Sequence, residues 1–289
     1  LGAAAALKNL DTDRPFRIVV YGTPAEETLG SKCDMIKKGC FHDLDVAFMM
    51  HGGPNTCTDV RCLAQRSFHV TFHGKRAHAA LAPDKGRSAF DALLAAFQGI
   101  EFLREHVPDD VRMHYTVAKL PGPANVVPAE AEGEFAIRSF SRKTLEGVCE
   151  RFLDIIKGAS LIAGVDYEIK EGTFFFNKIP VLKLNELLMD NARLAGAPQL
   201  APPREKTGST DFGNVMYEIP GSCIRVAFVP EGTPSHSQEF VDAGKTEAAH
   251  NCILYGAKAI AGASLDLIMT DGLMDQVKAE FAENKKKNQ

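Results

Sequence analysis

Residues 17–27 read Arg17-Ile18-Val19-Val20-Tyr21-Gly22-Thr23-Pro24-Ala25-Glu26-Glu27. The apolar, β-branched run predicts a buried strand over Arg17–Tyr21, and Gly22 and Pro24 mark its end. Ligands and metals usually bind at the carboxyl ends of the strands in an α/β sheet. Two adjacent carboxylates at such a place suit a site where one side chain holds a metal and its neighbour moves protons. The alternative interpretation of the Glu26-Glu27 pair is a solvated acidic turn.

The chain on either side of this stretch alternates strands with helices, which is typical of a parallel sheet. A helix is predicted over Gly30–Lys38, closed by Gly39, and a second apolar strand over Asp45–His51. The same alternation returns after residue 171, where we expect a helix, a strand and a further helix over Val181–Leu194, Ser222–Val229 and Thr246–Ile260. We therefore predict an α/β domain with a mainly parallel sheet, built from residues 1–61 and 172–289.

The middle of the chain has a different order of predicted strands and helices. Strands are predicted over Ser67–His73, Arg112–Ala118, Glu130–Arg138 and Asp166–Ile169. Amphipathic helices are predicted over Ser88–His106 and Thr144–Ala163. The resulting order β-α-β-β-α-β is that of a ferredoxin-like α+β sandwich. We predict that this smaller domain, residues 62–171, is inserted into the larger one.

Length and composition limit the class of protein. The 289 residues suggest about two domains. A net charge of -4 gives no reason to expect a nucleic-acid partner. No apolar run approaches the roughly 20 residues needed to span a bilayer, so we expect no membrane partner. The odd set of seven cysteines shows no paired spacing, which favours reduced thiols in a cytoplasmic protein.

The chain begins with Leu1-Gly2-Ala3-Ala4-Ala5-Ala6-Leu7-Lys8, a sequence typical of the middle of a helix. It has no capping residue and no initiator methionine, and it lacks the charged region of a signal peptide. We therefore expect that part of the natural protein lies before Leu1 or on another chain.

Three histidines are further candidate residues of the site predicted at Glu26 and Glu27. His51 ends a predicted strand in Met49-Met50-His51-Gly52, and His236 follows another in Thr233-Pro234-Ser235-His236. Imidazole and carboxylate groups are ligands suited to zinc or manganese, and groups at the same end of neighbouring parallel strands converge. His78 lies in the turn Gly74-Lys75-Arg76-Ala77-His78 of the inserted domain. Taken singly, each histidine is more often a structural or exposed residue.

Together these segments resemble the aminoacylase and carboxypeptidase-G family of dinuclear metallopeptidases. The resemblance is greatest to its amidohydrolase branch, which includes aminobenzoyl-glutamate hydrolase and relatives of β-alanyl-dipeptidase. It runs along essentially all of the chain. It rests on an ordered series of segments, which are Thr23–Glu27, His51–Pro54, Gly74–Ala80, Asn125–Pro128, Gly208–Val215 and Thr233–His236.

The resemblance implies a role for each candidate residue. Glu26 is implied as the general base and acid. Glu27, His51 and His236 are implied as ligands of two divalent ions, zinc or manganese. His78 is implied as a lid residue that reaches across a dimer to polarise the scissile carbonyl. Substrate contacts are implied for Asn125, Arg138, Gly208 and Ser209.

The resemblance also implies a Cys-Gly-His segment of further ligands, which this chain does not contain. Three hypotheses therefore stay open. The first is a metal-dependent hydrolase of amide bonds in N-acyl amino acids or dipeptides, a homodimer through the inserted lid domain. The second is a non-catalytic subunit or fragment that binds ligand and dimerises without a complete metal site. The third is a cysteine-dependent amidase, although none of the cysteines lies in a Cys-His signature.

Overall fold

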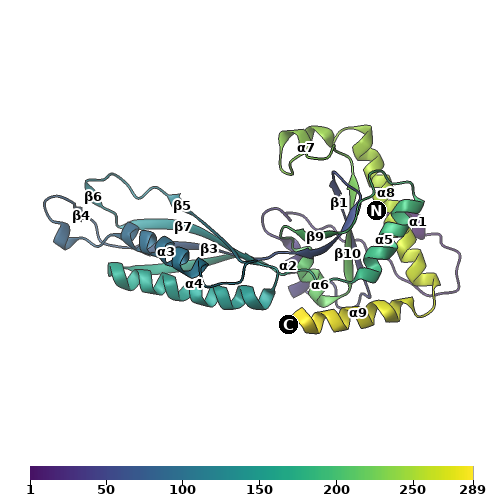
Figure 1. Ribbon diagram of the computed structural model, residues 1–289, viewed down its shortest axis with the longest axis horizontal. Helices are drawn as coiled ribbons and strands as arrows, with labels where there is room; N and C mark the ends of the chain where they lie inside the picture. Colours follow the sequence, from purple (N-terminus) through teal and green to yellow (C-terminus); the bar gives the residue numbers. More distant parts are fainter. Residues whose placement is uncertain (289) are drawn as a thin grey trace. The chain divides into compact units, whose positions relative to one another are not determined.

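The computed structural model describes residues 1–288, which form two compact units (Figure 1). The first unit contains Leu1–Cys62 and the chain from Lys178 onward. The second unit contains Leu63–Asn177. The fold class is therefore α/β with an inserted α+β unit, as the sequence predicts.

The second unit is a four-stranded antiparallel sheet covered by two helices. The strand order is β5-β7-β3-β8, and a two-stranded sheet pairs β4 with β6. These strands span Ala64–His73 (β3), Ala77–His78 (β4), Arg112–Lys119 (β5), Val126–Val127 (β6), Glu130–Ser139 (β7) and Asp166–Phe175 (β8). The helices span Ala89–Arg104 (α3) and Arg142–Ala163 (α4), with a 3-10 turn at Pro83–Lys85 (η1).

The core of the second unit follows from the alternation in β3. Phe68, Val70 and Phe72 are buried and pack against residues of α3 and α4 such as Leu93 and Phe152. The serines at residues 88 and 141 begin the two helices, because each hydroxyl accepts a hydrogen bond from a backbone N–H three residues on. The predicted β-α-β-β-α-β order is confirmed, and the strand after residue 166 runs on to residue 175.

The first unit contains a mixed sheet with strand order β1-β10-β2-β9. Its strands span Ala47–Gly53 (β1), Cys57–Cys62 (β2), Arg204–Thr207 (β9) and Gly221–Ala227 (β10). The pairs β1–β10 and β2–β9 are parallel, whereas β10 and β2 are antiparallel. The sheet is therefore mainly parallel, as predicted, with one antiparallel pair that joins the two parallel pairs. The strand β2 is not predicted, because its polar sequence does not distinguish it from a loop.

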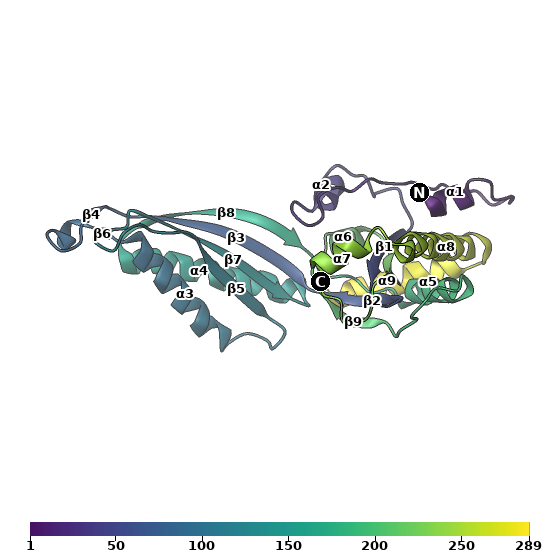
Figure 2. The same ribbon diagram turned by 90° about the horizontal axis from the view of Figure 1, so that it is seen from above.

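Helices lie on both faces of this sheet. They span Gly2–Leu7 (α1), Ser31–Lys37 (α2), Leu182–Leu194 (α5), Phe212–Glu218 (α6), Gln238–Ala243 (α7), Glu247–Met269 (α8) and Leu273–Asn288 (α9). Ile224 and Val226 of β10 pack against α5 and α8, whereas Cys223 packs against α6. Figure 2 shows the segment that carries α1 and α2 running along one side of the unit.

Helix α8 is long and apolar enough to cross a membrane by length and composition alone. This differs from the expectation that no segment of the chain approaches the required length. In the structure α8 packs against α5, α1 and β10. Helices that pack inside water-soluble proteins pass the same test of length and composition.

The predicted strand over Arg17–Tyr21 is wrong. The segment has no strand assignment, and Ile18, Val19 and Val20 are exposed. It lines an apolar hollow of about 560 Å³ together with Phe48 of β1. The physical reason is that β-branched residues favour extended backbone, but a strand also needs a neighbouring backbone in register, and this segment has none.

Candidate active site

The two glutamates lie in a tight turn between residues 22 and 30. The backbone carbonyl of Ala25 accepts hydrogen bonds from the N–H groups of Leu29 and Gly30, at 3.0 and 2.9 Å. Ala25 has a φ of +60°, which residues with a side chain rarely adopt. Glu26 is half-buried and Glu27 is exposed. The backbone of the turn, rather than side-chain packing, therefore holds the two carboxylates.

Glu27 lies beside His236. The Oε2 atom of Glu27 is 3.9 Å from Nε2 of His236, and the two side chains are 68% and 73% exposed. The structure thus brings together two of the predicted metal ligands, which are more than 200 positions apart in the sequence. Like Ala25, His236 has a φ of +60°.

His51 lies near the end of β1, opposite Arg225 of β10. Nη1 of Arg225 is 3.0 Å from Nδ1 of His51, and the carbonyl oxygen of Gly52 is 2.5 Å from the same nitrogen. When Nδ1 carries the proton, it can donate to the carbonyl of Gly52, and when it does not, it can accept from Arg225. Burial and the guanidinium of Arg225 lower the pKa of His51, which keeps the imidazole neutral at pH 7.

The fit of these residues to a divalent metal is partial. Zinc binds nitrogen and oxygen ligands at about 2.0–2.2 Å, so two ligand atoms at a tetrahedral angle lie roughly 3.4 Å apart. The 3.9 Å between Glu27 and His236 is close to this spacing. Within residues 1–288, however, no three or more His, Cys, Asp or Glu side chains are grouped so that they could hold a metal. His51 therefore does not join the Glu27–His236 pair, and its role as a ligand stays a prediction.

His78 and Asn125 lie together in the second unit. His78 on β4 pairs with Val126 on β6, and the N–H of Ala79 donates to the carbonyl of Asn125 at 3.1 Å. Nδ1 of His78 accepts from two backbone N–H groups, those of Ala80 and Leu81, at 3.3 Å each. The neutral ring therefore carries its proton on Nε2 and can donate it to an acceptor.

Arg138 lies on β7 of the second unit and is half-buried. Burial lowers the pKa of its guanidinium, and its Nε atom is buried without a partner in the described chain. Ser209 has a buried hydroxyl that also lacks a partner among the described residues. Unsatisfied buried donors of this kind are uncommon in folded proteins and suit contacts with a ligand.

The loop with Gly208 and Ser209 is tied to the helix that follows the glutamates. Nζ of Lys32 lies 2.7 Å from Oδ1 of Asp211, and the backbone N–H of Lys32 donates to Oδ2 at 3.2 Å. Both side chains are buried. The pair joins α2, which follows the glutamate turn, to the start of α6.

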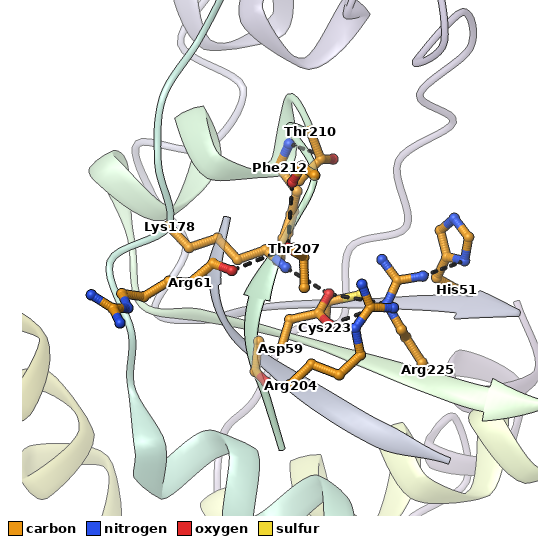
Figure 3. A network of polar contacts seen from close by, with 12 residues as sticks. His51, Asp59, Arg61, Lys178, Arg204, Thr207, Thr210, Phe212, Cys223 and Arg225 are labelled. Carbon is orange, nitrogen blue, oxygen red and sulfur yellow. Dashed lines mark hydrogen bonds and ion pairs between the residues drawn. The ribbon is translucent and has the colours of Figure 1, made fainter. Parts of the chain in front are cut away.

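A buried group of charges in the first unit is not predicted from the sequence (Figure 3). Asp59 of β2 accepts a hydrogen bond from Nζ of Lys178 at 3.0 Å and one from Nε of Arg225 at 3.1 Å. Burial opposes the charged form of Asp59, but Lys178 and Arg225 outweigh it and hold the pKa below its usual value. No motif marks Asp59, since one acid in a polar strand is ordinarily solvent-exposed.

Comparison with known proteins defines the class. The model of a peptidase dimerisation domain matches residues 65–161. The Xaa-Arg dipeptidase of Mus musculus is 30% identical over 97% of this chain and 66% of its own length. One subunit of the p-aminobenzoyl-glutamate hydrolase of Escherichia coli (strain K12) is 27% identical over 90% of this chain and 66% of its own length.

A solved structure agrees in fold. The YXEP protein of Bacillus subtilis, a dinuclear metal binding peptidase from the M20 family, has a TM-score of 0.61 and is 18% identical, over 86% of this chain and 64% of its own. The comparisons thus define an α/β fold with a peptidase dimerisation domain. The chain belongs to the M20 peptidase family. It spans about two thirds of the length of the curated relatives, 66% in both cases.

Proposed function

We propose that this protein is a metal-dependent hydrolase of amide bonds in N-acyl amino acids or dipeptides. The observation that carries the proposal is the pairing of Glu27 with His236, next in sequence to the half-buried Glu26. The dipeptidase and aminobenzoyl-glutamate hydrolase named among its relatives support this class of substrate.

Glu27 and His236, together with His51, would hold the metal ions, for which we propose zinc or manganese. When bound, such ions polarise a carbonyl and lower the pKa of water to about 7. A carboxylate oxygen of Glu26 takes the proton from the attacking water and later gives it to the leaving amine. The charge of Glu26 acts to raise the pKa of His51 against the larger effects of burial and Arg225, so Glu26 and His51 lie within electrostatic reach.

The second unit supplies further groups. Nε2 of His78 donates to the carbonyl oxygen as negative charge develops on it. Arg138 binds the substrate carboxylate, because a planar guanidinium matches two carboxylate oxygens. Substrate contacts stay predictions for Asn125 and, within the first unit, for Gly208 and Ser209.

The direct test is Glu26→Gln in the full-length protein. The amide keeps the size of the side chain but cannot accept a proton, so we expect turnover to fall by about 10²–10⁴-fold. Metal content, measured by atomic emission, should remain that of the wild type. The control is Glu205→Gln, an exposed glutamate on β9 that should leave turnover unchanged. Retained activity in Glu26→Gln would remove Glu26 from the mechanism.

A second candidate function is a non-catalytic subunit that binds ligand and dimerises. The observation in its favour is that no three possible ligands are grouped within residues 1–288. Metal analysis separates the two proposals. About two ions per protomer would support the hydrolase. No bound ion, even with zinc or manganese supplied, would support the binding role.

A further inference from the structure

Four polar residues form a row across one face of the sheet in the first unit (Figure 3). His51 of β1 lies directly opposite Arg225 of β10, and Asp59 of β2 lies directly opposite Arg204 of β9. Arg225 reaches across to Asp59, which connects the two pairs. The row therefore extends from the candidate metal ligand His51 to the far edge of the sheet.

The row carries an excess of positive charge. Asp59 is its one carboxylate, and Arg225 and Arg204 approach it at N···O distances of 3.1 Å and 3.6 Å. One negative charge cannot balance both guanidinium groups. Elsewhere in residues 1–288, no carboxylate forms an ion pair with Arg225 or Arg204. Such an excess in a partly buried place is costly unless an anion compensates it.

The guanidinium groups of Arg225 and Arg204 have N–H donors that are not used in hydrogen bonds within the described chain. Arg225 uses Nε for Asp59 and Nη1 for His51, and Arg204 approaches Asp59 through Nε alone. The other terminal nitrogen of Arg225 and both terminal nitrogens of Arg204 have no acceptor in the part of the chain described. Both Nε atoms face the same oxygen of Asp59, so the two groups lie next to each other. Their side chains are 18% and 40% exposed, so a solute can reach them.

We propose that Arg225 and Arg204 form a binding site for an oxyanion, either a carboxylate or a phosphate. A planar guanidinium presents paired N–H donors that match two oxygens of such a group. The bound anion would offset the excess charge around Asp59. Arg138 of the second unit is a separate group, and the proposal does not involve it. The case of a substrate carboxylate rests on the proposed hydrolase function, whereas the case of a free phosphate does not.

The first experiment measures the binding of inorganic phosphate by isothermal titration and by thermal unfolding at constant ionic strength. We expect phosphate to raise the melting temperature of the wild type. Arg204→Gln should lose this rise and bind phosphate about tenfold more weakly or worse, because it loses charge-assisted hydrogen bonds. Arg204 is partly exposed, so the variant should fold. The control, Arg193→Gln on the surface of α5, should behave as the wild type.

Two outcomes would overturn the proposal. One is no phosphate binding by the wild type at millimolar concentration. The other is equal phosphate affinity in the wild type and in Arg204→Gln, which would place the anion elsewhere, for example on a bound metal ion.

The second experiment identifies the source of the anion. KM is measured for an N-acyl amino acid and for its C-terminal amide, which lacks the carboxylate. A rise in KM for the acid alone in Arg204→Gln would show that a substrate carboxylate occupies the site. Unchanged KM values together with weaker phosphate binding in Arg204→Gln would show that the site binds a free oxyanion. Both of these results support an oxyanion site at Arg225 and Arg204. Absence of hydrolysis by the wild type would contradict the proposed function. The phosphate-binding experiment would still test the oxyanion site, because it does not depend on hydrolysis.

Discussion

Among single residues, Asp59 is the buried carboxylate that Lys178 and Arg225 of the first unit share. Its side chain is buried and accepts hydrogen bonds from Lys178 and Arg225. A buried ion pair adds little to the free energy of unfolding compared with an apolar pair of the same shape. Removing one partner, however, leaves the other charge buried without a counter-charge, which is strongly destabilising. The consequences of losing Asp59 are therefore larger than those of losing an exposed acid.

Asp59→Asn should lower the free energy of unfolding by about 3–5 kcal/mol, because the buried Lys178 and Arg225 would lose the carboxylate that both of them contact. Urea denaturation followed by circular dichroism measures this change. The control is Asp271→Asn, whose side chain is 91% exposed, and it should stay within about 0.5 kcal/mol of the wild type. Equal stability of the two variants would mean that the Asp59 carboxylate is not needed in the folded state.

The same residue predicts a pH dependence. The pKa of Asp59 is lower in the folded protein than its ordinary value of 3.8, so the unfolded chain binds the proton more tightly. The stabilisation is complete above the unfolded pKa and is lost as the pH falls through the folded pKa. Stability measured from pH 6 down to pH 3 should therefore fall less steeply in Asp59→Asn than in the wild type. Parallel curves would contradict this assignment.

At the scale of elements, the short helices α2 and α6 connect the two loops of the candidate site. The buried Lys32–Asp211 pair spans from α2, which follows the glutamates, to the start of α6, which follows Gly208 and Ser209. Neither helix exceeds seven residues, so neither is stable without such tertiary contacts. The geometry of both loops therefore depends on this ion pair.

Asp211→Asn should loosen both loops, because the buried ammonium of Lys32 would lose its charged partner. We expect faster amide hydrogen exchange over residues 22–37 and 208–218, with exchange in β3 of the second unit unchanged. Asp34→Asn is the matched control, since Asp34 forms an exposed pair with Lys37 on the same helix. Exchange as slow as that of the wild type would show that other contacts fix the loops.

Elements whose information is local could be predicted from the sequence. The alternation of Phe68, Val70 and Phe72 specifies one buried face, and the strand β3 is found there. Strand pairing is not local information, which is why the prediction of a strand over Arg17–Tyr21 is wrong and the polar strand β2 is not predicted. The same holds for the site. Ordered motifs indicate Glu27 and His236, but the partners of Asp59 come from three separate segments that no motif connects.

At the scale of the whole molecule, the matched dimerisation domain leads us to propose a homodimer through the second unit. Multi-angle light scattering should give a mass about twice the 31.4 kDa of this chain. The mass should persist at high salt, since apolar contacts are not screened by ions. A mass equal to that of one chain at micromolar concentration would contradict the dimer.

The central claim is that Glu27 and His236 bind one divalent cation. The most direct measurement is the zinc content of the purified protein after equilibrium dialysis, compared between the wild type, Glu27→Gln and His236→Gln. His250→Gln, an exposed histidine on α8, is the control. We predict that the wild type and the control retain zinc and that the other two variants lose it. Equal zinc content in all four proteins would contradict the claim.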